Sequence, residues 1–209
     1  MHIEKLFPIG MLVHDVESEL ADRVEDIVVK KVNDIPRPAA DSPHATDYFK
    51  DKRVVDLPND LPELFKIICN CVDHYQTHNN MRITKRRESG FQLPYDMGPG
   101  FSTPAFYELE YWTQDYKEGD VHNEHDHGIG RISGIYWVRA NENAGGLQFR
   151  NPNPFVQYQS HHDVNAEFSW SEYVYAPVKG RILIYPSYLK HEVLKSGKDT
   201  IRTTIAFNT

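Results

Sequence analysis

After about residue 90 the chain becomes a succession of short runs rich in Tyr, Ile, Val, Phe and Trp, and this feature restricts the fold most. The runs are separated by turn-forming Gly, Pro and Asn, as in segments 143–146 and 151–154. Many short strands at this spacing are typical of an all-β barrel or a double-sheet jelly roll. The expected strands are residues 104–113, 131–139, 146–150, 172–177, 181–185, 191–196 and 200–207.

The segment before these strands has helical periodicity. Apolar residues recur at spacings of three and four in 15–31, where Asp15 can cap the helix, and again in 61–78, where Pro62 is tolerated in the first turn. Residues 33–60 hold four prolines and predict a surface loop. The residues expected to face inward are Val16, Leu20, Val24, Ile27, Val28, Leu64, Phe65, Ile68 and Val72.

Together these patterns predict a mainly β protein with N-terminal α-helices packed on one sheet. We expect a single domain over 1–209, with a helical flank in 1–90 and a jelly-roll core in 91–209. Residues 151–171, which include the aromatic Trp170, are expected to form a long irregular insertion.

Composition restricts the partners and the cellular compartment that we expect for the protein. A chain of 209 residues with 40% hydrophobic residues can bury a core, and a net charge of −7 argues against nucleic acid as a partner. The two cysteines, Cys69 and Cys71, are too poorly placed on a helix to pair and indicate free thiols in a reducing compartment. The N-terminus lacks a signal-peptide pattern, and no apolar stretch has the length of a membrane span, so we expect a cytoplasmic protein without membrane contact.

Residues 122–128 read His-Asn-Glu-His-Asp-His-Gly and are the strongest chemical signal. In an extended strand His125 and His127 project from the same face, and imidazole nitrogens bind first-row metal ions. By the same alternation His122 and Glu124 form a second possible pair. The segment therefore predicts a metal site without fixing its ligands.

Another histidine, His191 near the C-terminus, supports this prediction. If residues 196–199 form a turn between paired strands, His191 lies opposite Thr204 and Val193 lies opposite Arg202. His191, Arg202 and Thr204 then share a face, with Arg202 roughly 7–8 Å from His191 at the backbone. A short dicarboxylate spans this separation, and an arginine fork binds a carboxylate through two charge-assisted hydrogen bonds.

The order of these motifs resembles the Fe(II)/2-oxoglutarate-dependent oxygenase superfamily, and within it a group of oxygenases from bacteria and their phages. The resemblance covers roughly residues 105–208, and Phe7-Pro8-Ile9 also resembles the start of that group. It rests on five blocks in order, residues 125–128, 133–138, 145–149, 177–191 and 202–208.

The resemblance implies a double-stranded β-helix that uses Fe(II), 2-oxoglutarate and O2 to hydroxylate a substrate with release of succinate and CO2. It implies His125 and His191 as metal ligands, with Arg202 and Thr204 binding the distal carboxylate of 2-oxoglutarate. Tyr116 and Trp137 are further expected contacts of the co-substrate.

One position departs from the superfamily, which usually has an acid where this chain has His127. Three ligand sets are compatible with the sequence. The first is His125, His127 and His191; the second draws on His122 and Glu124; the third is two histidines completed by water or by a bulged Asp126. A third neutral ligand leaves the site one charge more positive than a carboxylate does.

Two other functions compete with the oxygenase. A cupin-like metalloenzyme also carries a His-x-His pair but leaves Arg202 without a role, and an inactive jelly-roll binding module needs no metal. The substrate, a small molecule or a protein side chain, is not identified by the sequence, and an oligomer is compatible with it.

Overall fold

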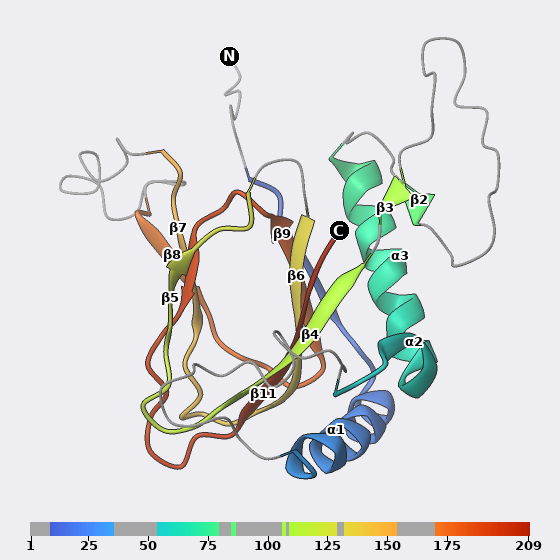
Figure 1. The fold of residues 1–209 in the computed structure, drawn as a ribbon. Helices are drawn as coiled ribbons and strands as arrows, with labels where there is room; N and C mark the ends of the chain where they lie inside the picture. Colours follow the sequence, from blue (N-terminus) through green and yellow to red (C-terminus); the bar gives the residue numbers. More distant parts are fainter. Residues whose placement is uncertain are drawn as a thin grey trace, which may run out of the picture.

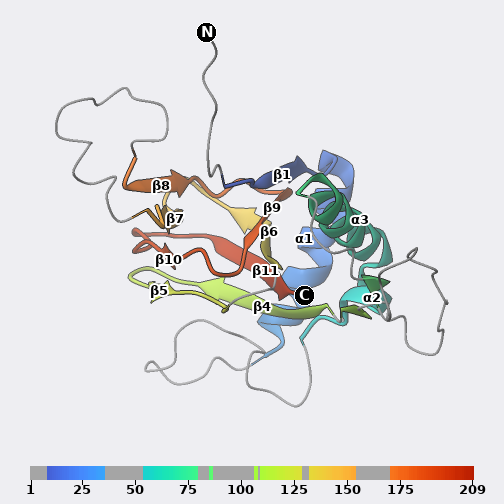
Figure 2. The same ribbon diagram turned by 90° about the horizontal axis from the view of Figure 1, so that it is seen from above.

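A computed structural model describes residues 9–35, 54–79, 85–86, 106–107, 109–128, 132–153 and 170–209. The chain forms three layers, a smaller sheet, a larger sheet and a layer of helices, in that order across the molecule (Figures 1 and 2). This confirms the predicted mainly β jelly roll with helices on one sheet.

The larger sheet is antiparallel and has the strand order β1-β9-β6-β11-β4. β11 lies between β6 and β4, so both of its edges are paired and all seven of its residues are buried. The strands are β1 (Leu12–Asp15), β4 (Glu110–Tyr116), β6 (Ile132–Ala140), β9 (Arg181–Pro186) and β11 (Arg202–Asn208).

The smaller sheet is also antiparallel, in the order β5-β10-β7-β8. Its strands are β5 (His122–His125), β7 (Leu147–Arg150), β8 (Glu172–Tyr175) and β10 (His191–Val193). A separate parallel pair joins β2 (Lys85–Arg86) to β3 (Phe106–Tyr107).

Three helices cover the outer face of the larger sheet (Figure 1). They are α1 (Ser18–Asn33), α2 (Leu57–Asp60) and α3 (Pro62–His78). The residues of α1 and α3 that repeat at helical spacing are buried against β-strand residues in one core, as with Val28, Leu64 and Ile68 beside Ile182 and Ile184. Of the predicted inward residues, Ile27 is exposed instead.

The start of α1 differs from the prediction. Asp15 ends strand β1, and its carboxylate accepts two hydrogen bonds from Arg181, at 2.7 and 2.8 Å, so it does not cap the helix. The residue before α1 is Glu17, which makes no side-chain capping bond. The ion pair with Arg181 fixes the chain at the edge of the sheet and delays the helix by three residues.

The predicted pairing of 191–196 with 200–207 is wrong. β10 pairs with β5 and β7, whereas β11 pairs with β4 and β6 in the other sheet. The segment between them crosses from one sheet to the other, and Asp199 there has a positive φ of 56°. His191 and Arg202 still meet in the interior, because each lies on the inner face of its own sheet.

Other boundaries shift by a few residues. The strand expected at 104–113 is found at 110–116, and the loop expected at 33–60 contains α2. Most of that loop and most of the 151–171 insertion lie outside the described residues, although Trp170 is described and exposed. None of the described helices combines the length and the hydropathy that a membrane crossing requires.

Candidate metal centre

Three histidines meet between the two sheets. His125 ends β5, His191 begins β10 directly opposite it, and His127 follows β5 by two residues. One ring nitrogen from each can be chosen so that all three lie within 4.8 Å of one another. Nitrogens bound to a single first-row ion at about 2.1 Å lie about 3 Å apart, so small side-chain adjustments bring this group to a metal geometry.

Two backbone carbonyls determine which nitrogen of two rings is available. Nδ1 of His125 lies 2.7 Å from the carbonyl oxygen of Asn123, and Nδ1 of His191 lies 2.8 Å from that of Leu189. A carbonyl only accepts, so each Nδ1 carries a proton, and Nε2 is the nitrogen that offers a lone pair in the neutral ring. Such carbonyl contacts are the usual way in which a protein orients a metal-binding imidazole.

His191 is held as a neutral ring. It is 3% exposed, and burial, together with the nearby rings of His125 and His127, lowers its pKa to about 3 despite its hydrogen bond to Leu189. The hydroxyl of the buried Tyr185 lies 3.2 Å from its Nε2 and is placed to donate to that lone pair. The nitrogen is therefore unprotonated at neutral pH and free to bind a cation once this hydroxyl is displaced.

The histidine at 127 is positioned through its backbone. Its N–H donates to the carbonyl of Ser187 at 2.9 Å, which ties the segment after β5 to the turn after β9. The following residue, Gly128, has a φ of 84°, where L side chains are strained. This turn directs the His127 ring toward His191, with ring centroids 5.2 Å apart.

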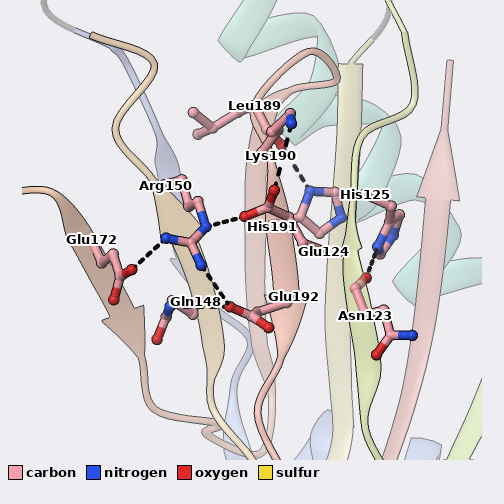
Figure 3. A network of polar contacts seen from close by, with 10 residues as sticks. All are labelled: Asn123, Glu124, His125, Gln148, Arg150, Glu172, Leu189, Lys190, His191 and Glu192. Atoms are coloured by element: carbon pink, nitrogen blue, oxygen red, sulfur yellow. Dashed lines mark hydrogen bonds and ion pairs between the residues drawn. The ribbon is translucent and has the colours of Figure 1, made fainter. Parts of the chain in front are cut away.

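The nearby acids lie outside the histidine group. Glu124 projects from the outer face of the smaller sheet, where its carboxylate pairs with Arg150 and lies 3.5 Å from Lys190 (Figure 3). Desolvation raises the pKa of Glu124, but the hydrogen bond and charge of Arg150 outweigh it and hold that pKa below its ordinary value. The Asp126 carboxylate accepts from the Gly128 N–H at 3.0 Å.

His122, the partner of Glu124 in the second ligand set, stacks on His125 with ring centroids 4.1 Å apart. It lines the pocket beside the three histidines but is not one of the group whose nitrogens converge.

Arg202 begins β11 and is fully buried, with 0% exposure. None of its three guanidinium nitrogens has a hydrogen-bond partner among the described residues, and its Cζ lies 4.1 Å from the centre of the Tyr116 ring. Burial lowers its pKa, opposed by Tyr116 and Tyr185, yet a guanidinium remains charged in proteins. A buried cation without an anion is costly, so this residue requires an acceptor that the described part of the protein does not supply.

Other unused polar groups surround it. Thr204 lies opposite Trp137 across the β11–β6 pair, and both are 0% exposed. The Thr204 hydroxyl and the Trp137 Nε1–H also lack partners among the described residues. Three neighbouring positions thus hold donors without an acceptor, which is the arrangement that a carboxylate satisfies.

The structure therefore brings all seven predicted site residues to the interior between the sheets. Sequence reasoning gave no role to Trp112, Gln114, Tyr185 or Asn208, which line a pocket next to the histidines. Alternation along β4 could have identified two of them, since Trp112 and Gln114 are four and two residues before Tyr116.

A jelly roll with converging histidines and a buried unpaired cation in its interior indicates a class of metal-binding proteins that also take an anionic ligand. Residues 110–208 match the family described as "Putative 2OG-Fe(II) oxygenase". The region 110–208 is thus similar to the 2OG-Fe(II) oxygenases, a family of oxidoreductases that use Fe(II), 2-oxoglutarate and O2, and the three converging histidines suit an iron ion.

Solved structures with the same fold agree in architecture. A Pseudomonas putida prolyl-4-hydroxylase is similar with a TM-score of 0.56 and 11% identity, covering 96% of this chain and 92% of that one. HygX from Streptomyces hygroscopicus, a structure with iron bound, is similar with a TM-score of 0.51 and 11% identity, covering 96% of this chain and 81% of that one. No curated protein matches the sequence.

Proposed function

We propose that His125, His127 and His191 hold Fe(II) and that Arg202 binds the distal carboxylate of 2-oxoglutarate. Thr204 and Trp137 donate to the same carboxylate, and the face of the Tyr116 ring lies against the guanidinium. The observation that carries this assignment is the full burial of Arg202 with no anionic partner in the described part of the chain.

When bound, iron supplies the activation of O2 by which 2-oxoglutarate becomes succinate and CO2 while a substrate C–H becomes C–OH. The chain contributes binding and orientation. The carbonyls of Asn123 and Leu189 keep two imidazoles in the tautomer that offers Nε2. The buried walls around Arg202 exclude water, which strengthens its attraction for a carboxylate.

The contacts that Glu124 and Asp126 already make favour the three-histidine ligand set over its alternatives. Glu124 is engaged with Arg150 and Lys190 on the opposite face of its strand, and Asp126 with the backbone of Gly128. Recruiting either carboxylate requires breaking these contacts and turning the strand, whereas the three histidines need only small adjustments.

The test is the formation of succinate from 2-oxoglutarate with added Fe(II) and ascorbate, on protein purified without a histidine tag. We expect turnover that is lost in His191→Ala and Arg202→Met. We also expect Mn(II) with N-oxalylglycine, an inert 2-oxoglutarate mimic, to raise the melting temperature of the wild type.

Two outcomes would contradict the assignment. Metal binding without any effect of N-oxalylglycine would indicate a cupin-like enzyme, and absence of metal binding would indicate a binding module. Full affinity of Arg202→Met for N-oxalylglycine would place the co-substrate elsewhere.

Several expectations accompany this proposal. The substrate is a small molecule or a protein side chain, and oligomerisation is allowed. We retain one domain over 1–209, divided at about residue 90, and a cytoplasmic location without nucleic acid or membrane partners.

A further inference from the structure

Resting on the proposed function, we propose that Gln114 is the recognition point for the substrate, and that the substrate presents an uncharged amide group to it. Gln114 lies on the inner face of β4, next to the candidate metal centre.

The pocket beside the histidines has a distinct chemical character. Its described lining includes the histidine cluster, Trp112, Gln114, Tyr185 and Asn208, with aliphatic side chains between them, and no Asp, Glu, Lys or Arg. Trp112 is close to the metal centre, since its ring centroid lies 6.1 Å from that of His127. A cationic group entering this pocket would lose its hydration without gaining an opposite charge, and a metal ion on the histidines would repel it.

The polar side chains that line the pocket differ in whether they already make hydrogen bonds within the protein. The Ser133 hydroxyl donates to Asn208 Oδ1 at 2.7 Å and lies 2.8 Å from the hydroxyl of Ser187. The Asn208 amide nitrogen in turn lies 3.5 Å from Nδ1 of His127. These side chains form one connected group that braces His127.

Gln114 stands apart from this group. It is 6% exposed, it lines the pocket, and it takes no part in the hydrogen bonds that connect Ser133, Ser187, Asn208 and His127. An amide buried to this extent is normally paired within the protein or with a ligand. Gln114 therefore offers one acceptor and one donor group to whatever fills the pocket.

The chemistry of a carboxamide selects its complement. Its oxygen accepts and its NH2 donates, so a group that both donates and accepts satisfies it through two hydrogen bonds. A carboxylate or an ammonium satisfies only one half of the carboxamide, and an ammonium also adds a positive charge that the pocket does not pair. A secondary amide, such as a peptide bond, has the required pair of groups, and the Trp112 ring offers an apolar surface beside it.

Gln114 lies next to the co-substrate end of the interior but lines a different space. It pairs across the sheet with Thr204, but Thr204, Arg202 and Tyr116 do not line the pocket that Gln114 lines. The donors around Arg202 have no acceptor, whereas the pocket at Gln114 offers both kinds of group. The two ends thus suit different ligands, an anion and a neutral amide.

The experiment uses full-length protein loaded with Zn(II), which is diamagnetic, and N-oxalylglycine. The probe is N-acetyl-L-alanine N-methylamide, and isopropylammonium, a cation that cannot chelate the metal ion, is the charged probe; binding is followed by saturation-transfer NMR. We expect the blocked amide to bind and isopropylammonium not to bind. We expect Gln114→Leu to weaken binding of the blocked amide at least about 10-fold, as the loss of two hydrogen bonds predicts.

Gln148→Leu is the control variant. Gln148 lies on β7 and donates to Glu192 at 3.1 Å on the outer face of the smaller sheet (Figure 3). We expect it to change binding of the blocked amide less than about 2-fold. Gln114→Glu, which keeps the size of the side chain, provides a second test if Gln114→Leu fails to fold, and it should weaken binding of the amide as well.

The outcomes distinguish this inference from the proposed function. If N-oxalylglycine fails to bind the wild type, the proposed function fails first. If N-oxalylglycine binds but the blocked amide does not, or binds both Gln114 variants as well as the wild type, the inference at Gln114 is overturned. If Gln114→Leu weakens N-oxalylglycine and not the amide, Gln114 belongs to the co-substrate end, which also overturns it.

Discussion

Arg202 differs from the other described arginines of the two sheets in having no anionic partner. Arg139 donates to Thr203 at 2.7 Å and lies 3.3 Å from Asp115, Arg150 pairs with Glu172 at 2.5 Å, and Arg181 pairs with Asp15. These pairs lie at or near the surface, whereas Arg202 is enclosed. A residue that opposes stability in this way is expected where a ligand provides the missing charge.

Replacing Arg202 by methionine should therefore separate stability from binding. We expect the free energy of unfolding of the ligand-free protein to stay equal or rise, because an unpaired buried charge is removed. We expect affinity for N-oxalylglycine in the presence of Mn(II) to fall by about 2–5 kcal/mol, as for other truncated charge pairs. Denaturant titration and calorimetry measure the two quantities.

Arg139→Met is the control, since Arg139 is paired on the other face of the sheet. It should lower the free energy of unfolding by about 1–3 kcal/mol, because the nearly buried Asp115 loses a partner, and leave N-oxalylglycine binding unchanged. Equal loss of binding in both variants would mean that Arg202 acts only through the stability of the sheet.

Tyr185 leads to a second prediction at the same scale. Its hydroxyl competes with a metal ion for Nε2 of His191, at 3.2 Å. Tyr185→Phe removes this competitor and should tighten Mn(II) binding, without co-substrate, by about 2- to 10-fold, the equivalent of one net hydrogen bond. Electron paramagnetic resonance of free Mn(II) measures this affinity, and weaker binding in the variant would show that the hydroxyl instead supports the metal site.

The sequence identified the interior residues better than it identified their neighbours. Alternation shows which side chains share a face, and it grouped His125 with His127 correctly. It cannot show to which sheet a strand belongs, so His191 and Arg202 were assigned to one hairpin when they lie in facing sheets. Gln114 and Tyr185 were missed because glutamine and tyrosine in a strand are common and their unused polar groups appear only once the interior is closed.

At the scale of elements, turns and close approaches determine how the two sheets fit together. Gly145 precedes β7 where the backbone of Leu194, just after β10, passes directly over it. A Cβ at Gly145 would overlap the carbonyl oxygen of Leu194, which is backbone and has little room to move. The Gly145–Gly146 pair thus allows β7 and the end of β10 to lie together beside the metal centre.

Gly145→Ala should consequently lower the free energy of unfolding by about 1–3 kcal/mol, as other overpacked sites do. Gly197→Ala is the matched control, because a Cβ there meets Asn143 at an ordinary 3.4 Å and should be tolerated. Urea titration of both variants tests the difference, and equal stabilities would show that the turn relaxes more easily than its geometry suggests.

Element boundaries were predictable where local signals agree. The helix expected at 61–78 is found at 62–78, since proline in the first turn and a regular apolar stripe indicate the same start. β1 was missed because its four residues show no alternation of buried and exposed positions, and the start of α1 was misplaced because Asp15 is engaged by an arginine 166 residues away. A local sequence pattern cannot show a partner that lies this far away along the chain.

At the scale of the whole molecule, the helices and the larger sheet share one hydrophobic core. Residues of α1 and α3 and residues of β6, β9 and β11 belong to the same buried cluster. A second cluster lies between the sheets and contains Tyr116, Trp137 and Tyr185. One face of the larger sheet therefore packs against the helical flank, and its other face lines the interior that holds the candidate metal centre.

This arrangement predicts one cooperative unfolding transition for the chain. Far-ultraviolet circular dichroism, which follows the helices, and near-ultraviolet dichroism, which follows the aromatic residues between the sheets, should give the same midpoint. Leu64→Ala, a fully buried residue of α3, should lower both midpoints together and cost about 2–5 kcal/mol. Two separate midpoints would show that the helical flank is a domain of its own.

The most direct test of the central claim is a crystal structure of the protein with Mn(II) and N-oxalylglycine. We expect one metal ion bound by a ring nitrogen from each of His125, His127 and His191, and the distal carboxylate of N-oxalylglycine hydrogen-bonded to Arg202. A metal ion bound through Glu124 or Asp126, or a ligand that leaves the Arg202 guanidinium without an anion, would contradict the account.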